Sequence, residues 1–93
     1  MSNPEFNILV IDDSEDDRFL YRRALQKSEG TQYILHETSN GEEGLQAIEA
    51  QRPACILLDY SLPGRNGIEI LKRIRSRYPF IPVVMMTGQG NES

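Results

Sequence analysis

Residues 8–13 read Ile-Leu-Val-Ile-Asp-Asp, an uninterrupted apolar run followed at once by two acids. A continuous apolar run of this length is typical of a strand that is buried on both faces of a parallel sheet. The acids mark the carboxyl end of the strand. The segment therefore predicts a central strand, Ile8 to Ile11, with carboxylates at the edge of the sheet.

Two later segments show the same pattern, an apolar run followed by a polar residue. The run from Ala54 to Leu58 is apolar and is followed by Asp59, and the run from Ile81 to Met86 is apolar and is followed by Thr87. Residues 32–38 have strand composition with only weak alternation, so we expect a further strand there.

Segments with apolar residues at helical spacing separate these strands. The first begins at the capping residue Ser14 and ends at Gly30, the second runs from Glu42 to Gln51, and the third is capped by Asn66 and stopped by Pro79. Strict alternation of strand and helix favours crossover connections and a parallel sheet with helices on both faces. We therefore expect an α/β fold.

Length and composition allow one small domain. The chain has 93 residues, of which 39% are hydrophobic and 26% are charged, a balance typical of globular proteins. We interpret residues 1–6 as a polar leader and residues 7–93 as the domain. No apolar stretch is long enough to cross a bilayer, so we expect no membrane contact.

Charge and cysteine content exclude further classes. The net charge of −4 disfavours direct binding to nucleic acid. The single cysteine cannot form an internal disulfide, and the absence of a Cys or His cluster excludes a zinc site of the usual kind. With no signal peptide at the N-terminus, these features indicate a cytoplasmic protein.

The polar residues that follow the strands predict a site. Functional groups of an open parallel sheet gather at the carboxyl ends of its strands, which brings Asp12, Asp13, Asp59 and Thr87 to one edge. Neighbouring carboxylates repel one another unless a cation lies among them, and hard oxygen ligands suit Mg²⁺. A carboxylate beside Mg²⁺ can attack phosphorus, so the site indicates phosphoryl transfer. Taken alone, Asp13 is more simply a helix cap.

These residues and their neighbours resemble the receiver domain of two-component response regulators. The similarity lies in Asp12-Asp13, in residues 57–67 (Leu-Leu-Asp-Tyr-Ser-Leu-Pro-Gly-Arg-Asn-Gly) and in residues 82–87 (Pro-Val-Val-Met-Met-Thr). The resemblance implies a flavodoxin-like, doubly wound parallel sheet of strand order 2-1-3-4, without the fifth strand and last helices of the family.

The resemblance also implies roles for individual residues. Asp59 is then the phosphoacceptor, taking its phosphoryl group from a sensor histidine kinase or a phosphotransfer domain. Asp12, Asp13 and Asp59, with the backbone carbonyl of Ser61, hold Mg²⁺, and Thr87 is the switch hydroxyl that turns toward the phosphoryl group. It implies a signalling protein and not a dedicated enzyme.

Family members continue for about thirty more residues, a length that fits ordinary α/β elements. This sequence has no counterpart of the family's lysine at the end of the fifth strand, so we expect a receiver domain that is incomplete at its C-terminus and impaired in signalling. The segment from Ile81 to Met86 would then be an uncovered edge strand, and we expect the chain to form homo-oligomers through it.

Other functions remain open at this point. The main alternative is a receiver-like fragment that does not signal and acts as a protein interaction or self-association module. A metal-dependent phosphohydrolase is less well supported because Ser61 stands where such enzymes often have a second Asp. A nucleotide-binding loop is disfavoured because acids, and not glycines, follow the first strand.

Overall fold

The computed structural model describes residues 5–27, 29–62 and 67–86. Strands and helices alternate along the chain in the order β1 (Glu5–Ile11), α1 (Glu15–Gln26), β2 (Gln32–Thr38), α2 (Gly41–Gln51), β3 (Cys55–Asp59), α3 (Gly67–Arg77) and β4 (Val83–Met86). The predicted alternation of strand and helix is confirmed.

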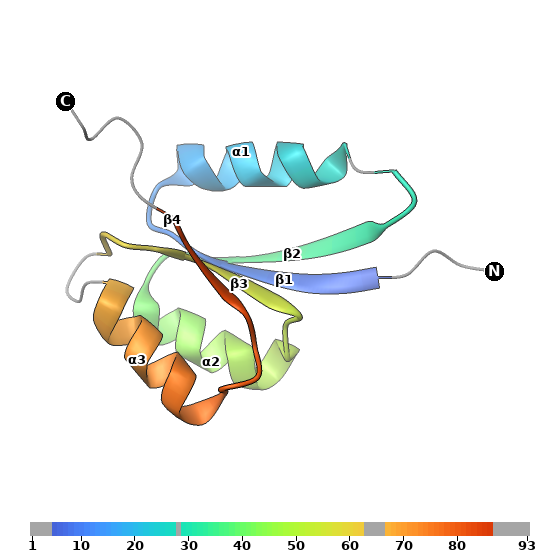
Figure 1. Cartoon of the computed structure of the whole chain (residues 1–93). Helices are drawn as coiled ribbons and strands as arrows, with labels where there is room; N and C mark the ends of the chain where they lie inside the picture. Colours follow the sequence, from blue (N-terminus) through green and yellow to red (C-terminus); the bar gives the residue numbers. More distant parts are fainter. Residues whose placement is uncertain (1–4, 28, 63–66, 87–93) are drawn as a thin grey trace.

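The strands form one parallel sheet in the order β2-β1-β3-β4 (Figure 1). In this sheet β1 pairs with β2 on one side and with β3 on the other, and β3 pairs with β4. Pairing of Ile11 with Leu58 sets the ends of β1 and β3 side by side. The predicted α/β fold and its strand order 2-1-3-4 are confirmed.

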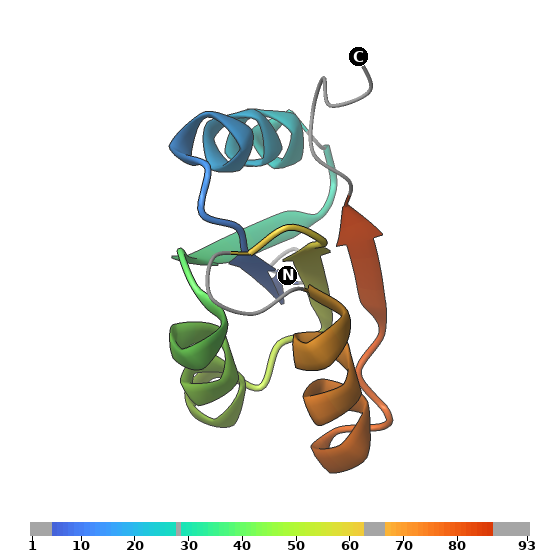
Figure 2. The same ribbon diagram turned by 90° about the vertical axis from the view of Figure 1, so that its left-hand side faces the viewer.

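Helices cover the two faces of the sheet unequally. Figures 1 and 2 show α1 on one face and α2 and α3 together on the other. The hydrophobic core lies on the side of α2 and α3, where the fully buried side chains include Leu9, Ile48, Ile56 and Ile74. By contrast, α1 has no fully buried residue. Its attachment to the sheet therefore depends more on partly buried and polar contacts.

Side-chain caps fix the start of two helices. The Ser14 side chain accepts a hydrogen bond from the backbone N–H of Asp17 at 3.2 Å and caps α1. Asn40 accepts from the N–H of Glu43 at 2.9 Å and caps α2. Each cap satisfies one of the free N–H groups of the first turn, which is why these residues begin helices.

Several element ends differ from the sequence-based expectation. Strand β1 begins at Glu5, so Glu5 and Phe6, which we assigned to the polar leader, pair with Gln32 and Tyr33 of β2. The apolar run that predicts this strand begins only at Ile8, and Glu5 and Phe6 extend it through pairing with β2 and not through apolar composition. Strand β4 begins two residues later than expected, at Val83.

The helix ends also differ in part. Helix α1 ends at Gln26, before the expected stop at Gly30, which lies in the following turn with a φ of +82°. Helix α2 begins one residue earlier than expected, at Gly41. Asn66, expected to cap α3, lies outside the described residues.

Candidate functional site

Three acids meet at the carboxyl edge of the sheet. Asp12 directly follows β1, and Asp59 is the last residue of β3. Asp13 is exposed, whereas Asp12 and Asp59 are only 1% and 6% exposed. One carboxylate oxygen from each residue lies within 4.8 Å of the others. The adjacency of β1 and β3 thus produces the cluster that the sequence predicts.

The two buried carboxylates are held in the same manner. Asp12 Oδ1 accepts a hydrogen bond from the backbone N–H of Ser14 at 2.9 Å, and Asp59 Oδ1 accepts one from the N–H of Ser61 at 3.2 Å. In each pair the donor lies two residues after the acid, as in an Asx turn. The turn engages Oδ1 of each carboxylate and so fixes the direction in which each side chain leaves the backbone.

Burial makes the negative charge in this cluster costly. Burial, together with the charges of Asp12 and Asp13, raises the pKa of Asp59 to about 6 against the opposing hydrogen bond from Ser61. Burial also raises the pKa of Asp12, and the charges of Asp17 and Asp13 add to the effect. The carboxylates therefore favour protonation or a cationic partner.

The cluster opens to solvent through a cleft between the ends of the strands and the first turn of α1. Its lining residues are Asp13, Ser14, Asp16, Asp17, Leu20, Asp59 and Ser61. Acidic side chains predominate, which is why the cleft attracts cations and repels a free anion. A small ligand can reach Asp59 from this side.

The residues fit a hard divalent cation. Carboxylate oxygens from separate segments converge in an open cleft, and the burial of two of them leaves their charge poorly solvated. Oxygen donors with room for water are the ligand set that Mg²⁺ prefers. Of the predicted ligand residues, the structure brings together Asp12, Asp13 and Asp59.

The backbone carbonyl of Ser61 and the hydroxyl of Thr87 complete the set of predicted site groups. Ser61 lines the same cleft, but the role of its backbone carbonyl as a ligand stays a prediction. Thr87, the predicted switch hydroxyl, lies outside the described residues.

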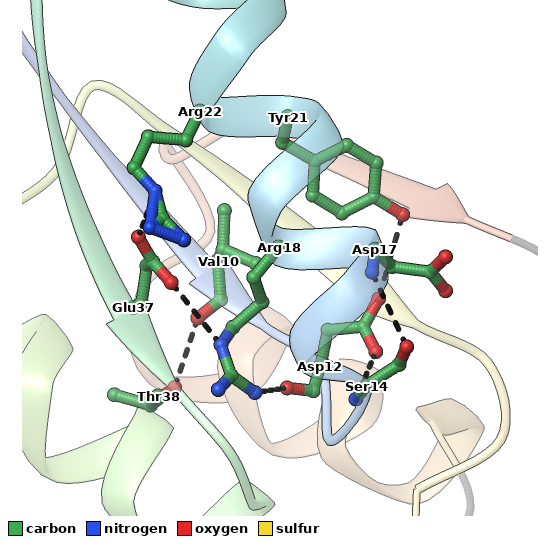
Figure 3. A network of polar contacts seen from close by, with 9 residues as sticks. All are labelled: Val10, Asp12, Ser14, Asp17, Arg18, Tyr21, Arg22, Glu37 and Thr38. Carbon is green, nitrogen blue, oxygen red and sulfur yellow. Dashed lines mark hydrogen bonds and ion pairs between the residues drawn. The ribbon is translucent and has the colours of Figure 1, made fainter.

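Sequence reasoning missed two side chains of α1 that reach the site. Arg18 Nη1 donates to the backbone carbonyl of Asp12 at 2.6 Å, and the Tyr21 hydroxyl donates to Asp12 Oδ2 at 3.4 Å (Figure 3). Burial together with the charge of Asp12 raises the pKa of Tyr21 to about 12. Helical spacing from the cap Ser14 could have indicated them, because residues one and two turns along share its face.

Among the described residues, no helix is both long and apolar enough to cross a membrane.

Comparisons with known proteins agree with the fold and the acid cluster described above. A family model described as the response regulator receiver domain matches residues 8–93. The transcriptional regulatory protein SrrA of Staphylococcus aureus is 34% identical over 93 residues, which are 100% of this chain and 36% of that protein. The chain thus spans about a third of the length of the curated relatives it matches.

Solved structures that are similar to this chain agree with the family match. The phosphorylated cyanobacterial phytochrome response regulator RcpA is 30% identical, with a TM-score of 0.83 over 95% of this chain and 69% of that one. NtrX from Brucella abortus is 34% identical, with a TM-score of 0.79 over 94% of this chain and 20% of that one. The strand order, the acid cluster at the ends of β1 and β3 and these likenesses lead to one conclusion: the chain belongs to the receiver domain family of two-component response regulators.

Proposed function

We propose that Asp59 accepts a phosphoryl group from a sensor histidine kinase or a phosphotransfer domain in a Mg²⁺-dependent reaction. The observation that carries this proposal is the placement of Asp59 in the acid cluster. Its carboxylate is nearly buried, lies beside two further acids and lines an open cleft. The structure of the relative RcpA is described as phosphorylated, which supports the same chemistry here.

Asp12, Asp13 and Asp59, with the backbone carbonyl of Ser61, would hold the cation. When bound, Mg²⁺ supplies positive charge against these carboxylates and the oxygens of an incoming phosphoryl group. The chain itself orients the proposed nucleophile, since the N–H of Ser61 donates to Asp59 Oδ1 and holds the carboxylate in place.

In the transfer, an Asp59 carboxylate oxygen attacks phosphorus, and a new O–P bond forms as the P–N bond of a phosphohistidine breaks. The electron pair of the broken bond returns to the imidazole nitrogen. Attack requires Asp59 in its ionised form, and a pKa of about 6 leaves it mostly ionised at neutral pH. The product is an aspartyl phosphate on β3.

Intact-mass spectrometry tests the proposal. We expect the 93-residue chain to gain the mass of one phosphoryl group after incubation with Mg²⁺ and a small acyl phosphate, and to gain nothing in EDTA. Asp59→Asn should not react. Asp17→Asn is the matched control, because Asp17 lines the same cleft but lies outside the acid cluster, and it should still react.

If the folded wild-type chain gains no mass, the phosphoacceptor role is overturned. The alternative of a receiver-like module that acts through protein contacts would then be favoured. A gain that persists in Asp59→Asn would place the acceptor on another residue and would equally contradict the proposal.

We further propose that the 93-residue chain self-associates through β4, with a second copy as the partner. In the described sheet β4 pairs with β3 along one side only. Its sequence is Val-Val-Met-Met with no charged residue, Val84 is 45% exposed, and the nearby Phe80 is 93% exposed. An apolar edge strand with free backbone groups is a template for pairing with another chain.

Val84→Lys is expected to shift the protein toward the monomer, because a charge on an edge strand opposes edge-to-edge pairing. Sedimentation velocity across a concentration series measures this. Ile34→Lys is the control, since Ile34 is similarly exposed but lies on β2, and it should leave association unchanged. A wild-type chain that is monomeric at all concentrations contradicts the proposal.

A further inference from the structure

One guanidinium joins three segments next to the acid cluster. Arg18 lies in the second turn of α1, and its side chain is only 16% exposed. Its Nη1 donates to the backbone carbonyl of Asp12 at 2.6 Å, and its Nε donates to Glu37 Oε1 at 3.1 Å (Figure 3). Arg18 thus connects α1, the end of β1 and the end of β2.

Glu37 is itself held from two sides. Its second oxygen, Oε2, lies 3.1 Å from Nε of Arg22, one turn further along α1. Glu37 is 25% exposed, so its two ion pairs are less screened by water than pairs on an open surface. The carboxylate fixes the position of Arg18, and Arg22 helps to fix the carboxylate.

The contact with the Asp12 carbonyl has a consequence for the site. That carbonyl belongs to the peptide group between Asp12 and Asp13, two residues of the acid cluster. The direction in which both side chains leave the backbone depends on the orientation of this peptide. Charge-assisted hydrogen bonds to a carbonyl are short and strong, and the 2.6 Å distance agrees with this.

We propose that Arg18 is a positioning residue for the divalent-cation site, which it supports by fixing the peptide between Asp12 and Asp13, with Glu37 as its anchor. The inference rests on the proposed function. It adds that cation affinity depends on a contact outside the ligands, reaching from the edge strand β2 through α1 to the cluster. Groups that orient ligands without touching the metal typically change metal affinity by 10–100-fold, which is about the size of effect expected.

The competing interpretation is that these residues only fasten α1 to the sheet. Arg22 separates the two interpretations. It shares Glu37 with Arg18 and comes from the same helix, but its hydrogen bonds and ion pairs with described residues do not include Asp12. A fastening role predicts similar effects from Arg18 and Arg22, whereas a positioning role predicts an effect on cation binding from Arg18 alone.

The experiment compares Arg18→Met with Arg22→Met in the 93-residue chain. The loss of the free-ion signal in electron paramagnetic resonance gives the affinity for Mn²⁺. Competition of Mg²⁺ with bound Mn²⁺ then gives the affinity for Mg²⁺, the proposed ion. Thermal unfolding without metal gives the stability of each variant. The amide resonance of Asp13 reports directly on the peptide that Arg18 contacts.

We expect Arg18→Met to weaken cation binding about tenfold and to shift the Asp13 amide resonance. Arg22→Met should lose stability without either change. Glu37→Gln, which keeps an oxygen acceptor but removes the charge, should give an intermediate loss of affinity. It also serves as the test if Arg18→Met does not fold.

Equal affinities for wild type and Arg18→Met, or equal losses for Arg18→Met and Arg22→Met, would overturn the inference. A wild-type chain that binds neither ion would instead contradict the proposed function. The wild-type affinity thus separates the two failures.

Discussion

Without divalent cations, Asp59→Asn is expected to raise the free energy of unfolding at neutral pH by about 1–3 kcal/mol. The wild-type carboxylate is buried and close to Asp12 and Asp13, so the folded state holds a poorly solvated and repelled charge. Asparagine keeps the shape of the side chain and can still accept the hydrogen bond from Ser61, but carries no charge. The proposed function therefore relies on a residue that is expected to destabilise the metal-free fold.

The stability difference between Asp59→Asn and wild type should depend on pH. The pKa of Asp59 is about 6 in the folded state, above its ordinary value of 3.8, because burial, followed by the neighbouring acids, raises it. The folded state then binds more protons than the unfolded state between these values, and stability from this group falls as the pH rises from about 4 to about 6. The advantage of Asp59→Asn should be small near pH 4 and largest above pH 6.

Urea unfolding at several pH values in EDTA measures the effect. Asp13→Asn is the control, because Asp13 belongs to the same cluster but is exposed, and its gain should be smaller. Adding Mg²⁺ should stabilise the wild type and narrow the difference from Asp59→Asn, since a ligand that binds only the folded state stabilises it. A metal-free Asp59→Asn that is less stable than wild type above pH 6 contradicts this account.

The second large effect is expected at Gly67, the first residue of α3. Gly67 is buried, and its N–H donates to the Tyr60 carbonyl at 2.7 Å. A Cβ on Gly67 would lie 2.8 Å from the Tyr60 Cα and closer still to the carbonyl oxygen of Asp59. Both neighbours are backbone atoms, which cannot rotate away. The chain must then move at the residue that carries the proposed nucleophile.

We therefore expect Gly67→Ala to destabilise the protein by about 2–3 kcal/mol and to weaken cation binding in the fraction that folds. Thermal unfolding and Mn²⁺ titration measure the two effects. Gly41→Ala is the matched control. Its Cβ would meet Ile70 Cδ1 first and would lie 2.8 Å from Ile70 Cγ1, both side-chain and not backbone atoms, so we expect a loss of stability without a loss of cation affinity, since Gly41 is not part of the acid cluster. Comparable stability for Gly67→Ala and wild type would show that the backbone at Asp59 and Tyr60 accommodates the methyl group.

Much of the fold follows from local sequence features. The apolar run before Asp12 predicts β1 because a strand buried on both faces requires such residues. Ser14 predicts the start of α1 because a side-chain oxygen is needed at the free N–H groups of the first turn. The general rule for parallel sheets then places Asp12 and Asp59 at one edge. These inferences need only short-range chemistry and one topological rule.

Other features could not be predicted because they depend on distant partners. The start of β1 at Glu5 follows from pairing with Gln32, which no local pattern reveals. The contact between Arg18 and the Asp12 carbonyl depends on how α1 lies on the sheet, and Glu37, nineteen residues from Arg18, completes it. An arginine on a helix is ordinarily interpreted as a solvated residue, and the pattern gave no reason to do otherwise.

The shared turn at Asp12 and Asp59 has a consequence for side-chain length. In both, one carboxylate oxygen accepts an N–H from the residue two positions on, while the acid also belongs to the cluster. Aspartate forms this turn because its single methylene holds the carboxylate close to the N–H two residues on. Glutamate at either position would keep the charge, but its longer side chain is expected to lose the hydrogen bond that holds the carboxylate in place. The length of the side chain, and not its acidity alone, thus sets how these two carboxylates are held.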